Sequence, residues 1–388
     1  MRKLPWLADD LQQRANDGLL RRRRETRWLP DGWCEIDGRR VSNFIANDYL
    51  NLAGDPRVVH AAETALRQSG LGARASALLG GRSDWHVRLE RRLADFEGQD
   101  AAILFPTGLA ANLGTVSALV SEHDAVFSDR LNHASLIDGC RLSKARVQIY
   151  RHDELDTLDR ILGEAHDRPR RWIVTDGAFS MDGDLAPLPD LCDLAERHRA
   201  ELIVDEAHAT GVFGNTGRGT AEHFGVEDRI AVRIGTLSKA LGALGGFVTG
   251  SQTLIDYLWN AARTQVFSTA LPPAVCAAAE AAVTIVQQEP GRIARLHELS
   301  NFLRTKLATA GVEVLAGSTG PIIPIVLNDP QRAVAVANRL EDRGFLVGAI
   351  RPPTVPRGTS RLRISVSTAH AESRLDELAT ALAGEWRR

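Results

Sequence analysis

Apolar residues recur with two alternating spacings between residues 56 and 290. Helical spacing covers residues 55–70 and 86–98, and in the second stretch Leu89, Leu93 and Phe96 fall on one face. Short apolar runs predict strands: "AAILF" (101–105), "AVFSD" (125–129), "RWIVTD" (171–176), "ELIVDE" (201–206) and "VRIGT" (232–236). Helices that alternate with apolar strands predict a large α/β domain over 56–290, built on a mainly parallel, doubly wound sheet.

The pattern changes on both sides of this segment. Residues 1–55 predict a helical arm followed by short strands. Residues 291–388 predict a helix, a strand, a helix, strands and a helix in that order, which indicates a smaller α+β domain. The arginine run 21–24 is interpreted as the solvated end of the arm helix, with a functional role for Arg21 as the alternative.

Composition and charge exclude several classes of protein. The 388-residue chain has a formal net charge of −2 and so lacks the basic field that nucleic-acid binding needs. No cysteine pair has metal-site spacing: the four are Cys34, Cys140, Cys192 and Cys276. The N-terminus has no signal-peptide core, and the apolar stretch 274–286 is short and carries Glu280. We expect a cytoplasmic protein without a metal, nucleic-acid or membrane partner.

The stretch "VDEAH" at 204–208 spells the Asp-Glu-Ala-His box of RNA helicases. A helicase also needs a phosphate-binding loop that ends in Gly-Lys-Ser or Gly-Lys-Thr. None of the four lysines, which are Lys3, Lys144, Lys239 and Lys306, lies in such a sequence. The helicase interpretation therefore fails, and "ELIVDE" predicts a buried strand that delivers Asp205 at its carboxyl end.

Chemically capable residues follow five of the predicted strands, and the carboxyl ends of parallel strands meet at one edge of a sheet. In chain order they are Thr107-Gly108, His133, Ser180, Asp205 with His208, and Thr236 with Lys239. Lys239 stands out in an arginine-rich chain because only a lysine can lose its proton and become a nucleophile. Gly108 opens a predicted helix, and a helix start is a natural anion site. A lysine, a carboxylate and an anion site are what pyridoxal phosphate requires.

The chain resembles the α-oxoamine synthases, a branch of the fold-type-I pyridoxal phosphate enzymes. The motifs that carry the resemblance run almost end to end: "NDYL", "TGLAAN", "NHASLIDG", "FSMDGDLAPL", "VDEAHATGVFG", "TLSKALG", "FSTALPP" and "IRPPTVPRGTSRLRIS". The resemblance implies a large domain with a mainly parallel seven-stranded sheet between helices, a smaller C-terminal α+β domain and an N-terminal arm. It also implies a homodimer with shared active sites.

The resemblance implies a role for each matching residue. Lys239 matches the lysine that bonds to the cofactor, Asp205 the partner of the pyridinium nitrogen, and His133 the histidine stacked on the ring. His208 matches the partner of the ring hydroxyl. Further cofactor-binding positions match Gly108, Leu109, Ser180 and Thr236, with Ser268 and Thr269 reaching the neighbouring subunit's phosphate. Substrate-binding positions match Arg21, His133, Thr354 and Arg363. The catalytic residues expected are Lys239, His133 and Asp205.

Members of this family join a small amino acid to an acyl thioester, carried on coenzyme A or an acyl-carrier protein. Three residues depart from the family pattern: Leu109 stands where an aromatic residue is usual, Arg74 where a small residue is usual, and Ser238 where a glycine usually precedes the lysine. A hydrolase is disfavoured because "GAFSMDG" is not a Gly-x-Ser-x-Gly elbow. A nicotinamide dehydrogenase is disfavoured because the spaced glycine fingerprint after an early strand is missing. A non-catalytic binding protein stays open, and the colour of the purified protein would distinguish it.

Overall fold

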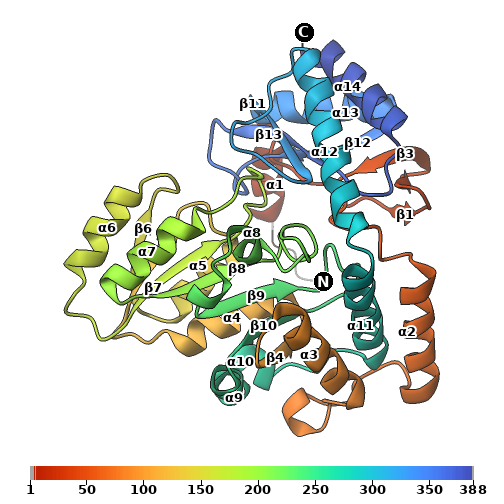
Figure 1. Cartoon of the computed structure of the whole chain (residues 1–388). Coiled ribbons are helices and arrows are strands. Elements are labelled where there is room, and N and C mark those ends of the chain that lie inside the picture. Colours follow the sequence, from red (N-terminus) through yellow and green to blue (C-terminus); the bar gives the residue numbers. More distant parts are fainter. Residues whose placement is uncertain (1–3, 5, 387–388) are drawn as a thin grey trace. The chain divides into compact units, whose positions relative to one another are not determined.

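The computed structural model describes residue 4 and residues 6–386, which form two compact units (Figure 1). Unit 1 comprises the described residues up to Tyr49, Met181–Gly183, and those from Arg295 onwards. Unit 2 comprises Leu50–Ser180 and Asp184–Ala294. The three-part division expected from the sequence, at residues 55 and 290, stays a prediction.

Unit 2 is built on a seven-stranded sheet, as expected. In spatial order the strands are β4 (Ala101–Phe105), β10 (Gly246–Gly250), β9 (Val232–Thr236), β8 (Glu201–Asp205), β7 (Arg171–Asp176), β5 (Ala125–Asp129) and β6 (Arg146–Tyr150). Only β10 is antiparallel to its neighbours, and the other pairings are parallel. The sheet is therefore mainly parallel, and the five strands predicted from apolar runs are among its members.

Helices cover both faces of this sheet because alternate strand residues point to opposite sides. The α-helices of unit 2 are α2 (Pro56–Ser69), α3 (Asp84–Glu97), α4 (Gly108–Leu119), α5 (Ala134–Leu142), α6 (Leu155–Glu164), α7 (Leu188–His198), α8 (Thr220–Phe224), α9 (Gln252–Ala261), α10 (Arg263–Val266) and α11 (Pro273–Gln288). On one face Phe127 and Val204 pack with residues of α6 and α7. On the other, Val126 and Ile203 pack with residues of α4, α5 and α9.

Unit 1 combines the two ends of the chain in one six-stranded sheet. The strands, in spatial order, are β1 (Thr26–Trp28), β2 (Trp33–Ile36), β3 (Arg39–Phe44), β12 (Phe345–Ile350), β13 (Ser360–Ser365) and β11 (Ile322–Asn328). β3 pairs in parallel with β12, so the N-terminal strands extend the C-terminal sheet. The helices are α1 (Trp6–Asn16), α12 (Gly291–Thr309, in this unit from Arg295), α13 (Pro330–Asp342) and α14 (Glu372–Trp386).

The interpretation of Arg21–Arg24 as the end of the arm helix is wrong. Helix α1 ends at Asn16, and Gly18 has a φ of +68°, a left-handed conformation that ends helices readily. The amide of Leu19 closes the helix end by donating to the carbonyl of Arg14 at 2.7 Å. The arginine run is irregular chain between α1 and β1, and Arg24 forms ion pairs with Asp37 and Glu341.

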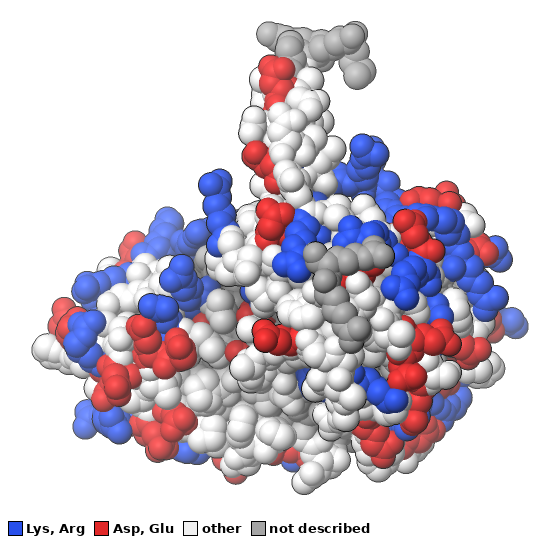
Figure 2. Space-filling model, turned by 90° about the horizontal axis from the view of Figure 1, so that it is seen from above, with Lys and Arg blue, Asp and Glu red and all other residues white. Residues whose placement is uncertain are grey.

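Charged side chains of both signs are interspersed over the face seen in Figure 2, in keeping with the net charge of −2. Within the part of the chain that the structure describes, no helix is both long and apolar enough to cross a membrane. The same residues contain no group of three or more His, Cys, Asp or Glu side chains that could hold a metal ion.

Candidate functional site

Gly108 and Thr236 lie against each other at the carboxyl end of the sheet in unit 2. Gly108 is the first residue of α4, just after β4, and Thr236 is the last residue of β9. A Cβ atom at Gly108 would lie 3.1 Å from the Thr236 Oγ1 and 3.3 Å from its Cβ. This close approach explains why a glycine is needed at position 108, and it brings two of the predicted cofactor residues together.

The start of α4 can accept an anion. The side chain of Thr107 caps the helix by accepting a hydrogen bond from the amide of Ala110 at 3.0 Å. The amides of Gly108 and Leu109 find no acceptor among the described residues. Two free N–H groups at the positive end of a twelve-residue helix form a binding site for a phosphate group.

Asp205 ends β8 as a buried carboxylate with defined partners. Its Oδ1 accepts from the amide of Ala207 at 2.8 Å, and its Oδ2 accepts from Nδ2 of Asn112 at 2.6 Å. The same Asn112 Nδ2 lies 2.8 Å from Oγ of Ser135, so helix α4, strand β8 and helix α5 are tied together. The carboxylate is therefore oriented by its neighbours before any ligand arrives.

His133, Asp205 and Lys239 lie within electrostatic range of one another. Desolvation lowers the pKa of His133, the charge of Asp205 opposes this shift, and the charge of Lys239 adds to it. The backbone amide of His133 donates to Oδ2 of Asp176 at 3.0 Å, while its Nδ1 lies 2.6 Å from Oγ of Ser135. The predicted lysine, carboxylate and histidine are thus brought to one place.

Asp176, at the end of β7, lies beside Asp205 in the parallel register of the sheet. Burial raises the pKa of Asp176 well above its ordinary value, the negative charge of Asp205 adds to this, and Lys239 opposes it. Asp176 therefore binds a proton more readily than an ordinary carboxyl group, which limits the negative charge concentrated in the site.

The loop that carries Lys239 is closed at its base by two hydroxyl groups. Thr236 Oγ1 donates to the carbonyl of Gly245 at 2.8 Å, and the amide of Gly245 donates to Oγ of Ser238 at 3.0 Å. The amide of Leu237 also donates to the carbonyl of Gly245. These contacts fix both ends of the 237–245 loop and so limit where Lys239 can lie.

The remaining predicted residues of unit 2 occupy nearby turns and one separate strand bridge. Ser180 follows β7 in the 177–186 loop, and His208 is buried in the turn after β8. Ser268 and Thr269 follow α10, and Thr269 forms an isolated bridge with Ser76.

Three predicted residues belong to unit 1. Arg363, on β13, is buried and donates to Oγ of Ser365, Oδ1 of Asn47 and the hydroxyl of Tyr49 at 2.8, 3.2 and 3.1 Å. Arg21 extends its Nη2 to 3.5 Å from the carbonyl oxygen of Arg351. The exposed Thr354 donates its amide to that same carbonyl, so Arg21 and Thr354 share one loop environment.

Asn112 and Asp176 were not among the predicted site residues, although Asn112 contacts Asp205 and Asp176 contacts His133. Each had a signal: Asn112 ends the motif "TGLAAN" one helical turn after Gly108, and Asp176 ends the strand "RWIVTD". A polar residue on an otherwise apolar helix face is buried here because it has a carboxylate to hold.

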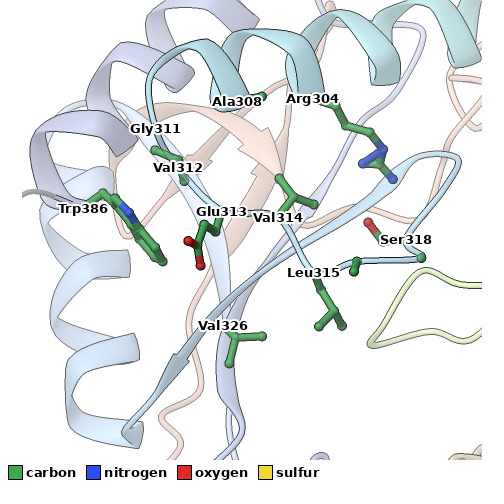
Figure 3. Close-up of a pocket in the computed structure, with 12 residues that line it drawn as sticks. Arg304, Ala308, Gly311, Val312, Glu313, Val314, Leu315, Ser318, Val326 and Trp386 are labelled. Atoms are coloured by element: carbon green, nitrogen blue, oxygen red, sulfur yellow. The ribbon is translucent and has the colours of Figure 1, made fainter.

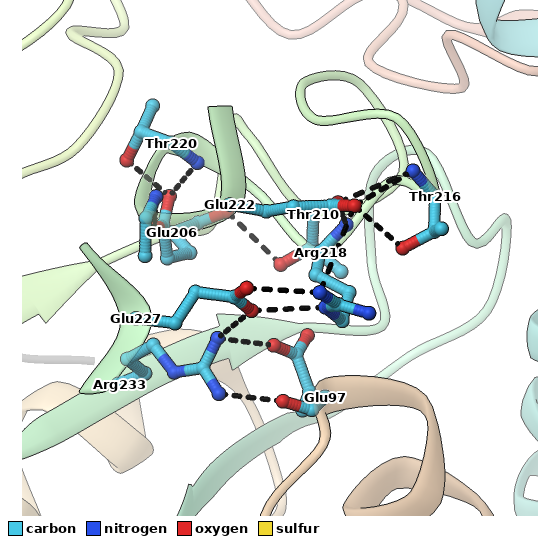
Figure 4. Close-up of polar contacts among 10 residues, drawn as sticks. Glu97, Glu206, Thr210, Thr216, Arg218, Thr220, Glu222, Glu227 and Arg233 are labelled. Atoms are coloured by element: carbon cyan, nitrogen blue, oxygen red, sulfur yellow. Dashed lines mark hydrogen bonds and ion pairs between the residues drawn. The ribbon is translucent and has the colours of Figure 1, made fainter. Parts of the chain in front are cut away.

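Charged residues next to β8 and on β9 form hydrogen bonds and ion pairs with neighbouring segments (Figure 4). Glu206, next to Asp205, accepts from the amide and hydroxyl of Thr220 at 2.9 and 2.7 Å. Arg233, on β9, forms ion pairs with Glu97 and Glu227 at 3.2 and 3.1 Å. Burial raises the pKa of Glu97 to about 8, although Arg233 lowers it. These contacts help to hold β8 and β9, which end in Asp205 and Thr236, in place.

A cavity of about 850 Å³ lies elsewhere, within unit 1 (Figure 3). Its lining includes Arg304, Leu315, Ser318 and Trp386, and none of the predicted site residues takes part. The candidate site is therefore assigned to the strand ends of unit 2, where charged and polar groups converge, and not to this cavity.

Comparisons with known proteins agree with the fold. The family model described as "Aminotransferase class I and II" matches residues 39–382. A Bacillus licheniformis protein named "Putative 8-amino-7-oxononanoate synthase" is 48% identical over 384 residues, covering 99% of this chain and 97% of the relative. "8-amino-7-oxononanoate synthase 2" of Bacillus subtilis is 45% identical over 373 residues, 96% of this chain and 95% of that protein.

Among solved structures, serine palmitoyltransferase from S. paucimobilis, determined with a bound pyridoxal phosphate–myriocin aldimine, superposes with a TM-score of 0.94. It is 30% identical, and the match covers 100% of this chain and 99% of that one. The expected fold-type-I architecture is confirmed. The chain belongs to the class I and II aminotransferase family and, within it, to the α-oxoamine synthases.

Proposed function

We propose that the chain condenses L-alanine with a pimeloyl thioester, releasing CO₂ and the free thiol, to form 8-amino-7-oxononanoate in biotin biosynthesis. The observation that carries this proposal is the 45–48% identity, over nearly the whole chain, to relatives named for that product. The enzyme is an acyltransferase that depends on pyridoxal 5′-phosphate. The cytoplasm remains the expected compartment.

The residues of unit 2 fit this cofactor. The two free amides at the start of α4, next to Thr236, suit its phosphate group, with Ser180 as a further donor. The buried carboxylate of Asp205 suits a protonated ring nitrogen, and Asn112 holds it in place. His208 is assigned to the ring hydroxyl and Lys239 to the aldehyde carbon. When bound, the cofactor supplies an electron sink for negative charge at the amino-acid α-carbon.

The side chains of the protein have separate tasks. The amine of Lys239 removes the α-proton of L-alanine and later returns a proton to the product carbon. Asp205 would stabilise the protonated ring nitrogen of the cofactor, because opposite charges at close range favour the ionised forms. His133 packs on the cofactor ring and donates a hydrogen bond toward the thioester oxygen. Its lowered pKa favours the neutral imidazole, which avoids a second positive charge beside Lys239.

Two arginines select the substrates. The guanidinium of Arg363, oriented by Asn47, Tyr49 and Ser365, is proposed to hold the alanine carboxylate in a bidentate pair. Arg21, with Thr354 in the same loop environment, is proposed to bind the distal carboxylate of the pimeloyl chain. The thioester carrier is coenzyme A or an acyl-carrier protein.

The enzyme is proposed to act as a homodimer with shared active sites. Large apolar side chains stand exposed on unit 2: Leu71, Leu78, Leu79, Leu109 and Phe267. Phe267 is 71% exposed and directly precedes Ser268 and Thr269, the residues assigned to the neighbour's phosphate. Burial of such a surface is a common driving force for subunit association.

Subunit complementation tests the sharing of sites. A Lys239→Ala chain and a chain with Ser268→Ala and Thr269→Ala are each expected to be nearly inactive as homodimers. A mixed dimer keeps one complete site, so co-expression of the two chains should restore part of the activity. Mixed dimers without activity would contradict shared sites.

A substrate panel tests the function itself. The purified protein is loaded with pyridoxal phosphate and offered L-alanine, glycine or L-serine, each with pimeloyl, acetyl, succinyl or palmitoyl thioesters. Product masses should show 8-amino-7-oxononanoate from L-alanine and pimeloyl thioester at the highest kcat/KM. A preference for glycine with acetyl-CoA or succinyl-CoA would instead identify a glycine C-acetyltransferase or a 5-aminolevulinate synthase.

A further inference from the structure

His152 bridges two carboxylates just beyond the sheet of unit 2. Its Nδ1 lies 2.8 Å from Oδ2 of Asp129, and its Nε2 lies 3.2 Å from Oδ2 of Asp184. The Asp129 side chain is 2% exposed and that of His152 is 18% exposed, so solvent screens the first pair little. The ring of Phe179 packs edge-on against the imidazole, with centroids 4.4 Å apart. The geometry fixes the ring from three sides.

The first carboxylate fixes the turn that leads to His133. Asp129 is the last residue of β5, and its Oδ1 accepts from the amide of Leu131 at 2.8 Å. Its carbonyl accepts from the amide of Asn132. The next amide, that of His133, donates to Asp176. The position of Asp129 therefore helps to set the position of His133, which caps the start of helix α5.

The second carboxylate fixes the loop that carries Ser180. The backbone carbonyl of Asp184 accepts from the amide of Phe179 at 2.9 Å, and Ala178 forms a bridge with Leu185. Ser180 directly follows Phe179, whose ring contacts His152. Thus one histidine connects the segment before His133 with the segment around Ser180, although the two segments are about fifty residues apart in sequence.

We propose that His152 is a positioning residue that, as an imidazolium, holds the Ser180 loop and the His133 turn at the spacing that cofactor binding requires. Two carboxylates can only accept hydrogen bonds, so the ring must donate from both nitrogens, and only the protonated ring does so. The inference rests on the proposed function, because it assigns Ser180 and His133 to the cofactor.

The electrostatics of the cluster support this protonation state. Desolvation lowers the pKa of His152, but the hydrogen bonds and charges of Asp129 and Asp184 outweigh it and raise the pKa to about 10. The imidazolium is therefore the resident form at neutral pH. Hydrogen bonds between charged partners are stronger than neutral ones, and a neutral replacement loses this advantage.

Apoprotein titration with pyridoxal phosphate tests the inference. Wild type and His152→Gln are titrated while the absorbance and the visible circular dichroism of the bound cofactor are recorded. Glutamine is neutral and donates from one nitrogen only, so it cannot replace the two charged hydrogen bonds that the imidazolium donates from separate nitrogens. We expect the Kd for the cofactor to rise about ten- to hundredfold, the size expected when one charged hydrogen bond is lost. The visible circular dichroism should weaken because Ser180 and His133 no longer hold the ring in one orientation.

Controls separate positioning from mere stability. His166 is an exposed histidine of the same unit, and its Nδ1 lies 3.1 Å from the carbonyl oxygen of Gly163. His166→Gln should therefore leave the Kd unchanged. Asp184→Asn should raise the Kd like His152→Gln, and the double variant should be less than additive because both changes break one contact. This second variant also keeps the test decisive if His152→Gln does not fold.

The outcomes differ for the two proposals. A His152→Gln apoprotein that melts at a lower temperature but binds pyridoxal phosphate with the wild-type Kd would overturn the positioning role alone. A wild-type apoprotein that does not bind pyridoxal phosphate would overturn the proposed function and this inference together.

Discussion

Nδ2 of Asn112 lies 2.6 Å from Oδ2 of Asp205, and both residues are buried. Asn112 stands one turn into helix α4, whose first residue is Gly108. The helix that offers its amides to an anion therefore also orients the carboxylate that ends β8. Helix α4 thus positions both the anion site at Gly108 and the carboxylate of Asp205, which lie about a hundred residues apart in the sequence.

Replacing Asn112 with leucine tests this coupling. Leucine keeps the approximate volume but leaves Asp205 without its side-chain donor in a buried environment. We expect kcat to fall about ten- to hundredfold, since a hydrogen bond to a charged group contributes about 1.5–3 kcal/mol. Ser117→Ala, on the same helix, is the control because its hydroxyl bonds the helix backbone. A wild-type kcat in the leucine variant would show that Asp205 does not depend on Asn112.

The sequence was informative where periodicity and chemistry agree. "AVFSD" and "ELIVD" are buried strands that end in aspartate, and both the elements and their shared edge were predicted. β10, "GFVTG", was not predicted, because the glycines at both ends and Thr249 leave only Phe247 and Val248 as an apolar run. The partners of Asn112 and His152 could not be assigned from sequence, because they come from distant elements that meet only in the fold.

Arg21 provides a test of substrate choice. Its Nη2 lies 3.4 Å from the carbonyl oxygen of Pro352, and its charge, together with burial, lowers the pKa of the neighbouring Arg351. Arg21→Ala should raise KM for pimeloyl thioester far more than KM for L-alanine. It should also lower the ratio of kcat/KM for pimeloyl thioester to kcat/KM for an equally long acyl thioester without the distal carboxylate. Arg22→Ala is the matched control. Equal losses of kcat/KM with both acyl thioesters would show that Arg21 lies outside the acyl site.

His370 makes the stability of the protein depend on pH. It is buried, accepts from the amide of Ser367 at 3.1 Å, donates to the carbonyl of Asn43 at 2.9 Å and stacks on Phe44. Burial lowers its pKa to about 4, despite the hydrogen bond to Asn43. The unfolded chain, with an ordinary pKa near 6.5, therefore binds the proton first as pH falls.

The stabilisation by neutral His370 should thus be complete above about pH 6.5 and decline toward pH 4, by roughly 3 kcal/mol in all. Urea unfolding at pH 7 and pH 5 measures the effect. Wild type should lose about 2 kcal/mol more between these values than His370→Gln, in which this titration is absent. Equal losses in the two proteins would mean that folding does not lower the pKa of His370.

We propose that Lys239 bears the cofactor in a site completed by Asp205 and His133. Borohydride reduction of the protein with bound pyridoxal phosphate, followed by digestion and mass mapping of the peptides, tests this assignment most directly. We expect one pyridoxyl group per chain, on the peptide that contains Lys239, and none in Lys239→Ala. The label on Lys144 or Lys306, or its persistence in Lys239→Ala, would contradict the assignment of the site.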